Sequence, residues 1–164
     1  VNSALKRARA NMDRQRPTSA EHEPPPAPKS HSEDAIVAKF VHAYESADLD
    51  ALVELLTDDA FISMPPIPLE YVGRDLVVEF VARIFRAGRL VDLLPTRANG
   101  QPAFGTYLRA PTGIHHGTGL IVLTLAGDRI SAMTRFDSSV LPWFGLPRSL
   151  RKTNPVYPGE VAPQ

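Results

Sequence analysis

Acid–base chemistry in this sequence would depend on a few side chains whose types suit proton transfer. By residue type, the candidates are Asp137, near the end of the last expected strand, and Tyr44 and His42 on the first expected helix. A positioned carboxylate can act as a general base, and a phenol can donate a hydrogen bond. The context also fits structural roles, because Ser138 and Ser139 follow Asp137 as in many turns and Tyr44 lies on an apolar helical face. Catalysis by Asp137 and Tyr44 is therefore the alternative hypothesis.

Other kinds of site chemistry lack a suitable pattern. The chain contains no cysteine, which excludes disulfides, thiolate nucleophiles and cysteine-based zinc sites. His115 and His116 are adjacent, so in a strand their side chains point to opposite faces and cannot easily share one metal ion. Neither an HExxH motif nor a glycine-rich phosphate loop occurs. We therefore expect no metal site and no cofactor.

Length and composition indicate one folded domain with tails. The chain has 164 residues, 43% of them hydrophobic, against about 150 residues for one domain. Of 16 prolines, five fall between residues 17 and 30, which predicts an extended linker over residues 17–31. The longest apolar run, Gly119 to Ala126, is too short to cross a membrane, and no signal peptide is evident. We expect a cytoplasmic protein without membrane contact.

The N-terminal segment is basic and has the spacing of a helix. Apolar residues recur every three or four positions between Val1 and Met12, which predicts one face of a short helix. Residues 1–31 carry a net charge of +3, and residues 32–141 carry −5. This asymmetry favours contact between the basic segment and a polyanion. The alternative is a solvated terminal tail.

Three helices and then a run of strands are predicted after residue 31. Ser32 is the expected cap of the first helix, which has the buried face Ile36, Val37, Phe40, Val41 and Tyr44. A short second helix is expected over residues 48–56, and a third over residues 74–87, ending at Gly88. Between them, a strand over residues 60–64 precedes a loop imposed by Pro65, Pro66 and Pro68.

Four strands follow the third helix. The expected runs are residues 89–98, 102–110, 117–127 and 128–138, with turns at Asn99-Gly100, Pro111 to His116 and Gly127-Asp128. Asn99-Gly100 favours a tight, solvent-exposed hairpin. Helices first and consecutive strands afterwards predict an α+β domain with an antiparallel sheet.

The C-terminal part carries aromatic residues in an irregular context. Trp143 and Phe144 stand between prolines in LPWFGLP, a composition that does not easily form a helix or a strand, so their rings are expected to cover a pocket mouth, a domain interface or the core. On the third strand of this group, Ile121, Leu123 and Leu125 alternate with Leu120 and Val122. Both faces are therefore apolar, which leaves a homodimer open.

Four stretches resemble a known family. These are VNSALKRARA, YESADLDALVELLTDDAFISMPP, PTRANGQPAFGTYL and FDSSVLPWFGLP. Together with the order of elements, they resemble the C-terminal half of extracytoplasmic-function (ECF) RNA polymerase sigma factors of the actinobacterial sigma-G type. In these proteins a SnoaL-like domain of the nuclear transport factor two-like superfamily follows the promoter-reading helix-turn-helix domain.

The resemblance implies a domain layout and a DNA contact. Residues 1–16 would be the end of the truncated region 4 helix-turn-helix, 17–31 the linker, 32–150 a SnoaL-like cone of three helices on a curved antiparallel sheet, and 151–164 a flexible tail. In the recognition helix, base edges would be contacted by Asn2 and Ser3 and phosphates by Lys6, Arg7 and Arg9.

The resemblance also implies a regulatory role with RNA polymerase and promoter DNA as partners. The cone would dock on the sigma core, with a small apolar ligand able to shift the docking equilibrium. Pocket or interface residues would be Tyr44, Met64, Arg97, Asn99, Gln101, Phe104, Asp137, Trp143 and Phe144. Because the superfamily includes isomerases and cyclases, an enzyme or ligand-binding domain of that type is the alternative.

Overall fold

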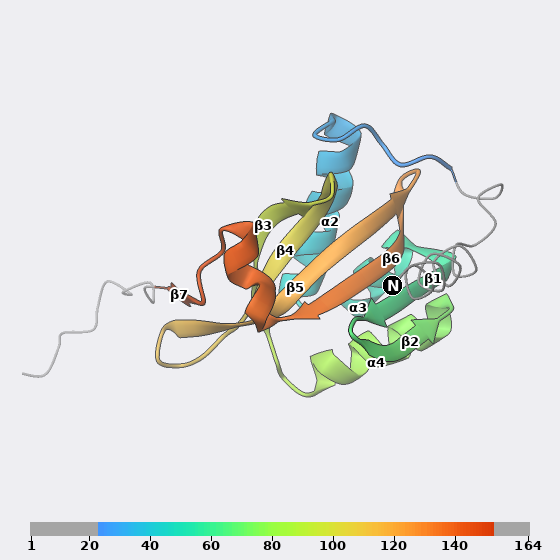
Figure 1. The fold of residues 1–164 in the computed structure, drawn as a ribbon. Coiled ribbons are helices and arrows are strands. Elements are labelled where there is room, and N and C mark those ends of the chain that lie inside the picture. Colours follow the sequence, from blue (N-terminus) through green and yellow to red (C-terminus); the bar gives the residue numbers. More distant parts are fainter. Residues whose placement is uncertain (1–22, 153–164) are drawn as a thin grey trace, which may run out of the picture.

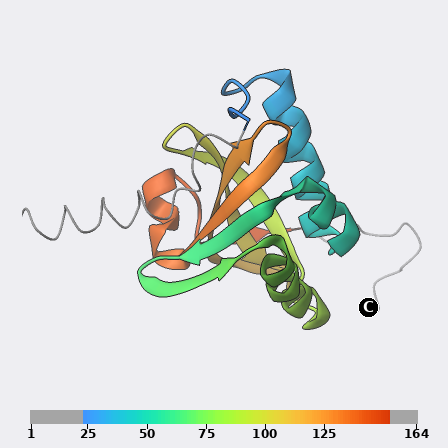
Figure 2. The same ribbon diagram turned by 90° about the vertical axis from the view of Figure 1, so that its right-hand side faces the viewer.

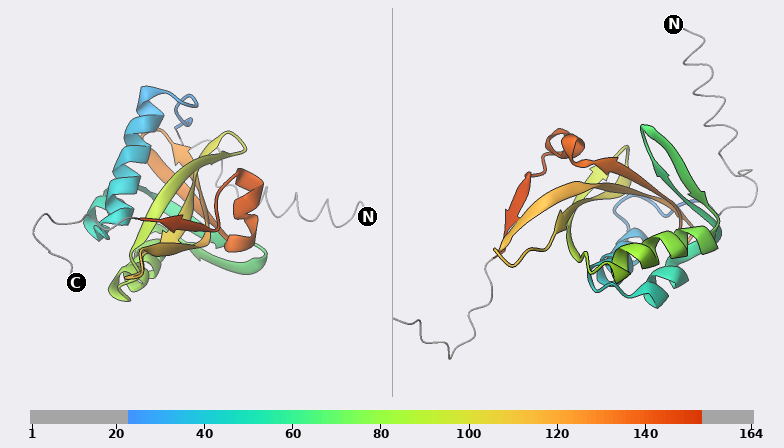
Figure 3. Two further views of the ribbon diagram at one scale, coloured as in Figure 1. Left: turned by 90° about the vertical axis from the view of Figure 1, so that its left-hand side faces the viewer. Right: turned by 90° about the horizontal axis from the view of Figure 1, so that it is seen from below.

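In the computed structural model, which describes residues 23–152, three helices lie on the concave side of a curved seven-stranded sheet (Figure 1; Figure 3, right). The helices are α2 (His31–Glu45), α3 (Leu49–Leu55) and α4 (Arg74–Arg86). The strands are β1 (Leu56–Met64), β2 (Ile67–Val72), β3 (Val91–Ala98), β4 (Gln101–Leu108), β5 (Ile114–Ala126), β6 (Arg129–Asp137) and β7 (Ser149–Arg151), and a 3-10 helix, η1 (Ser138–Phe144), follows β6. The predicted α+β class with three helices is confirmed.

Local signals at the helix ends explain where the helices begin and stop. The cap of α2 is Ser30, whose hydroxyl accepts a hydrogen bond from the Glu33 amide at 3.2 Å. The prediction of Ser32 as the cap was therefore two residues late, and both serines fit the residue preference for a cap. At the end of α4, Gly88 has a φ of 67°, the left-handed conformation in which glycine commonly ends a helix.

The sheet is mixed, which corrects the prediction of a purely antiparallel one. Its order is β2-β1-β6-β5-β4-β3, with β7 paired to β5. Strands β3 to β6 form antiparallel neighbours, whereas β1 runs parallel to β6. Only antiparallel neighbours can be joined by a tight hairpin. Because β1 and β6 are far apart in the chain, no turn dictates their relative direction.

The proline cluster forms a turn and an edge strand, where a loop alone was predicted. Pro65 and Pro66 occupy the turn, and the chain returns as β2, antiparallel to β1. Pro68 lies within β2, which is the outermost strand of the sheet. A proline is tolerated there because an edge strand has backbone N–H groups that need no partner strand.

The main core fills the space between the helices and the concave face of the sheet. Phe40 is fully buried, and its ring centroid lies 5.5 Å from the ring centroids of both Tyr44 and Phe104. Ile121 and Leu123 contribute to this core from β5. The helical spacing that predicted a buried face on α2 is therefore confirmed for Phe40 and Tyr44.

A second core lies on the convex face of the sheet. Figure 2 shows η1 on this face, on the side of the sheet opposite the three helices. Leu120 and Val122 of β5 pack there with Leu141 of η1, which is fully buried. The segment after β6 was predicted to be irregular, but it forms η1 and then β7. Since η1 covers the part of β5 around Leu120, that apolar strip needs no second subunit to bury it.

The end of the proline-rich segment lies against the domain. The Gly127 amide, in the β5–β6 turn, donates a hydrogen bond to the Pro24 carbonyl at 3.1 Å. Residues 25–28 then line a shallow cleft with Gln101 and Leu123. The expected helix over residues 1–16, including Asn2, Ser3, Lys6, Arg7 and Arg9, lies outside the described residues.

The Asn99-Gly100 hairpin agrees with the sequence. Asn99 and Gly100 have φ values of 52° and 75°, the pair of positive values that a tight two-residue hairpin turn requires. Strand β5, by contrast, begins at Ile114, inside the predicted turn over Pro111 to His116. The cause is its pairing with β7, because His115 lies opposite Leu150 and extends the strand beyond its apolar part.

Candidate functional site

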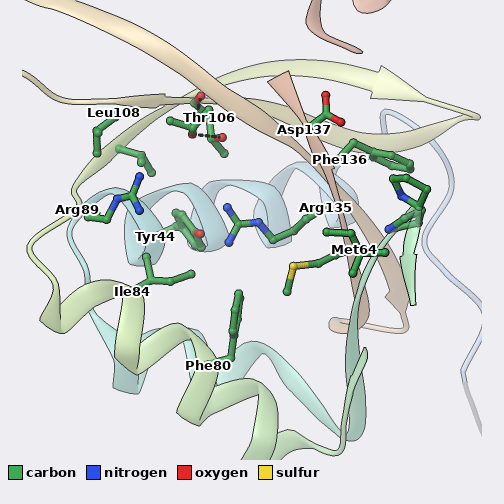
Figure 4. A pocket seen from close by; sticks show the side chains of 15 residues that line it. Tyr44, Met64, Phe80, Ile84, Arg89, Thr106, Leu108, Arg135, Phe136 and Asp137 are labelled. Atoms are coloured by element: carbon green, nitrogen blue, oxygen red, sulfur yellow. Dashed lines mark hydrogen bonds between the residues drawn. The ribbon is translucent and has the colours of Figure 1, made fainter. Parts of the chain in front are cut away.

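A cavity of about 440 Å³ lies between α4, the end of α2 and the concave face of the sheet (Figure 4). Most of its wall is apolar: Met64, Pro65, Pro66, Ile67, Phe80, Ile84, Val91, Leu108 and Phe136. The polar side chains that line it are Tyr44, Arg89, Thr106, Thr118, Arg135 and Asp137. Cavities of about 300–1,000 Å³ with an apolar wall and a few polar groups are typical of small-molecule sites.

Three of these polar groups converge. Figure 4 shows the guanidinium groups of Arg89 and Arg135 and the Tyr44 hydroxyl pointing into the cavity. The hydroxyls of Thr106 and Thr118 lie 2.8 Å apart and are hydrogen-bonded to each other. The two arginines and Tyr44 are therefore the groups available to a ligand.

The surroundings of Tyr44 keep its phenol neutral. Its ring lies between two other rings: its centroid is 5.5 Å from that of Phe40 and 5.6 Å from that of Phe85. Burial raises the pKa of the Tyr44 phenol, and the charge of Arg135 opposes that shift only in part. A neutral phenol can donate a hydrogen bond but is a poor proton acceptor.

Asp137 lines the cavity but does not aim its carboxylate into it. Its Oδ1 accepts hydrogen bonds from the Ser139 hydroxyl and from the Ser139 amide, the latter at 2.8 Å. These two hydrogen bonds lower the pKa of Asp137, which is exposed to solvent. In Figure 4 the carboxylate turns away from the centre of the cavity. Asp137 thus acts as the cap of η1 and does not meet the Tyr44 hydroxyl.

Of the other predicted site residues, some line the cavity and others make structural contacts elsewhere in the fold. Met64 lines the cavity, but Phe104 is 1% exposed within the main core. Arg97 forms an ion pair with Glu33 of α2, at 2.6 Å between Nη1 and Oε1. The Gln101 side-chain amide donates to the Thr124 hydroxyl at 3.0 Å.

The remaining predicted residues lie on the surface or against the convex face. Asn99 is exposed in its turn, and Phe144 packs partly buried against the second core. Trp143 is 86% exposed. Of the three alternatives predicted for the two rings, packing on a core applies to Phe144. Trp143 does not line the cavity, and its place at a domain interface stays a prediction.

The histidines do not gather into a metal site. The buried His115 places Nδ1 2.7 Å from Asp92 Oδ2, while His116 points outward to the Ser149 hydroxyl. His42 is exposed on α2. Within residues 23–152, no group of three or more His, Asp or Glu side chains is arranged to hold a metal ion.

Sequence reasoning missed the two arginines of the cavity. Arg135 stands two positions after Met133 on β6, and alternation places both on the concave face. The sequence signal that could have identified Arg135 was a charged residue on the same strand face as a core methionine. Arg89 follows the glycine that ends α4, and no pattern in the sequence distinguishes it from a solvated surface arginine.

Solved structures share this architecture at low sequence identity. An NTF2-like protein of unknown function from Mesorhizobium loti superposes with a TM-score of 0.56 at 21% identity, covering 68% of this chain and 95% of that one. An LEH-like epoxide hydrolase from Mycobacterium tuberculosis gives a TM-score of 0.51 at 17% identity, covering 67% of this chain and 85% of the other. These likenesses show the fold alone.

Sequence relatives are closer. The ECF RNA polymerase sigma factor SigG of M. tuberculosis H37Rv is 38% identical over 156 residues. The match covers 92% of this chain, which spans only 40% of the length of that sigma factor. The predicted resemblance to sigma factors of this type is thereby confirmed, and residues 37–133 match the SnoaL-like domain model. Within residues 23–152, no helix has the length and apolar character needed to cross a bilayer. By its matched domain and its fold, the chain belongs to the SnoaL-like domain family.

Proposed function

We propose that this chain is the regulatory SnoaL-like part of an ECF RNA polymerase sigma factor and that it binds a small molecule without transforming it. The observation that carries the proposal is the match to SigG over 92% of the chain. Promoter DNA and RNA polymerase are the partners of the whole protein in this proposal, and the cytoplasm is its place of action. Residues 1–16 then supply the end of the DNA-reading helix.

The cavity supports binding over catalysis. Among the described residues, the only acidic one that lines it is Asp137, which is exposed and hydrogen-bonded to Ser139. The phenol of Tyr44 is neutral. General-base catalysis needs a proton acceptor within reach of the substrate, and among the described lining residues no carboxylate faces the interior. Two arginines and a phenol can hold a ligand but do not supply that base.

Docking on the sigma core is proposed to use the segment from Phe136 to Pro147 and the hairpin from Arg97 to Phe104. In the first segment, Trp143 is exposed at the tip of η1, while the neighbouring Leu141 fixes η1 to the sheet. An exposed tryptophan on an anchored element has the character of an interface anchor. In the hairpin, Asn99 and Gly100 are the exposed residues.

We predict that Trp143→Ser weakens docking without changing the fold. Interface tryptophans commonly contribute 2 kcal/mol or more, so the affinity for separately expressed upstream sigma regions should fall by about 30-fold. The unfolding free energy should change by no more than about 0.5 kcal/mol, because the side chain is exposed. Val72→Ser, at a 62% exposed position on β2, is the matched control and should bind normally. Equal affinity of the wild-type chain and Trp143→Ser would remove Trp143 from the interface.

Transcription in vitro tests the regulatory role directly. The coding sequence upstream of Val1 should encode helix-rich polymerase-binding regions, and deleting residues 32–152 from that whole protein should change promoter-dependent transcript yield. Unrelated upstream sequence, or a yield that is the same with and without the domain, would contradict the proposal. Turnover of an organic compound, abolished by Asp137→Asn, would favour an isomerase or cyclase instead.

A further inference from the structure

The charges that line the cavity are unbalanced. Arg89 and Arg135 both direct guanidinium groups into it (Figure 4). Within residues 23–152, no carboxylate lies within ion-pair distance of either group. By contrast, Arg97 of β3 and Arg109, the residue after β4, are each paired with an acidic side chain. Arg89 is exposed at the edge of the cavity and Arg135 is partly buried, and the described protein neutralises neither charge.

Arg135 is the better enclosed of the two arginines. It is partly buried on the concave face of β6, with its guanidinium carbon 5.8 Å from the centre of the Phe80 ring. An aromatic face attracts a cation but compensates only part of the hydration that the cation loses on burial. An anion bound beside Arg135 would supply the missing partner.

Tyr44 adds a neutral donor at the same place. Its side chain is only 4% exposed. Within residues 23–152, no buried side-chain nitrogen or oxygen lacks a hydrogen-bond partner. The Tyr44 hydroxyl, for which no bond to the described residues is found, is therefore the accessible tip of a buried ring. Because this hydroxyl faces the cavity near Arg135 (Figure 4), it can donate a hydrogen bond to an acceptor atom of a ligand bound there.

The rest of the wall suits an apolar body. Phe80 and Ile84 of α4 face Met64 and Leu108 across the cavity (Figure 4). A ligand that satisfied the arginines alone would leave this apolar surface in contact with water. A molecule with one anionic end and an apolar remainder satisfies both parts of the wall.

We propose that the cavity binds an amphipathic carboxylic acid, with its carboxylate between Arg135, Arg89 and the Tyr44 hydroxyl and its apolar body along α4. A planar guanidinium matches a carboxylate with two parallel hydrogen bonds, and Tyr44 donates a third. The inference rests on the proposed ligand-binding role of the domain and names the chemical class of the ligand. It does not depend on docking to sigma.

Two matched series of probes test the proposal by calorimetry on the 164-residue chain. One is decanoate, 1-decanol and decylamine, and the other is 2-naphthoate, 2-naphthalenemethanol and 2-naphthylmethylamine. Hydrogen bonds to charged groups contribute about 1.5–3 kcal/mol, so the acid of at least one series should bind ten- to 100-fold more tightly than its alcohol. The amine should bind most weakly, because it adds a third positive charge.

Variants assign the selectivity to named side chains. Arg135→Met should reduce acid binding at least tenfold and leave alcohol binding within a factor of two to three. Arg135→Lys should keep part of the preference for the acid over the alcohol. Tyr44→Phe should reduce the affinity for the acid by about tenfold. Arg86→Met, an exposed arginine of α4 outside the cavity, is the control and should bind acid normally. Circular dichroism checks that each variant is folded.

Each outcome decides the proposal. Acid preference that is lost in Arg135→Met and kept in Arg86→Met supports it. Equal binding of acid and alcohol, preference for the amine, identical binding by all variants or no binding of any probe overturns it. Since these measurements contain no sigma regions or promoter, their failure leaves the regulatory proposal to its own transcription assay. An unchanged transcript yield, conversely, would not affect the assignment of the ligand.

Discussion

Replacing Phe104 by alanine lowers the free energy of unfolding by about 3–5 kcal/mol, the usual cost of truncating a buried phenylalanine. Phe104 is 1% exposed at the centre of the main core, where its ring packs on Phe40 of α2. Removing the ring leaves a cavity that rigid strands on both sides cannot close. Urea unfolding followed by far-UV circular dichroism measures the change.

The matched control is another aromatic residue truncated in the same way. Trp143→Ala removes a larger side chain, but that side chain is 86% exposed, so the unfolding free energy should change by no more than about 0.5 kcal/mol. A cost for Phe104→Ala as small as that for Trp143→Ala would contradict the assignment of Phe104 to the core.

Replacing Arg97 by methionine destabilises the domain by up to about 3 kcal/mol, because the Glu33 carboxylate is then left buried without its charged partner. Glu33 is 4% exposed. Its two carboxylate oxygens accept from the Arg97 guanidinium at 2.6 and 3.2 Å, and Oε1 also accepts from the Lys29 amide at 3.1 Å. Glu33→Gln should cost less than Arg97→Met, because the Arg97 side chain that it leaves without a partner is 30% exposed. The double variant should cost less than the sum of the two.

The stability of this pair also depends on pH. The hydrogen bond from Arg97 holds the pKa of Glu33 below its ordinary value of 4.5. A carboxylate with a lowered folded-state pKa contributes stability above its unfolded pKa and loses it as pH falls through the folded value. Stability of the wild-type chain should therefore drop below about pH 4.5 more steeply than that of Arg97→Met, as measured by urea unfolding between pH 7 and pH 3.

An exposed pair supplies the control. Glu79 and Arg83 on α4 lie 3.4 Å apart, and their side chains are more than 60% exposed. Such pairs are worth about 0.3–0.5 kcal/mol, so Arg83→Met should have little effect. If Arg97→Met were equally mild, the pair at Glu33 would contribute no more than a surface contact.

The sequence predicted an element correctly where one local pattern determines its structure. The apolar spacing through Phe40 and Tyr44 specified the buried face of α2, and Asn99-Gly100 specified a hairpin. The prolines misled the prediction because their constraint depends on neighbours: Pro68 is excluded from a central strand but fits β2 at the edge. The parallel pairing of β1 with β6 joins segments that no local sequence connects.

The candidate site was less predictable from the sequence. Tyr44 and Met64 were chosen by residue type and line the cavity, whereas Arg97 and Phe104 belong to the structural framework. The difference arises because side-chain type does not specify which partner a residue meets across the fold. Arg97 and Arg135 have the same chemistry in sequence, but only Arg97 has Glu33 opposite it in space.

The anchored end of the proline segment limits how a promoter-reading region could reach η1. Pro24 is held at the β5–β6 turn, whereas η1 begins at the far end of β6, nine residues and about 30 Å away. The six residues from 17 to 22 extend at most about 20 Å. The linker alone is therefore too short to reach Trp143, and a folded domain attached to it would have to span the remaining distance with its own diameter. In the proposed docking, engagement within one polypeptide would be governed by local concentration, and the proposed switching would then be independent of how much protein the cell contains.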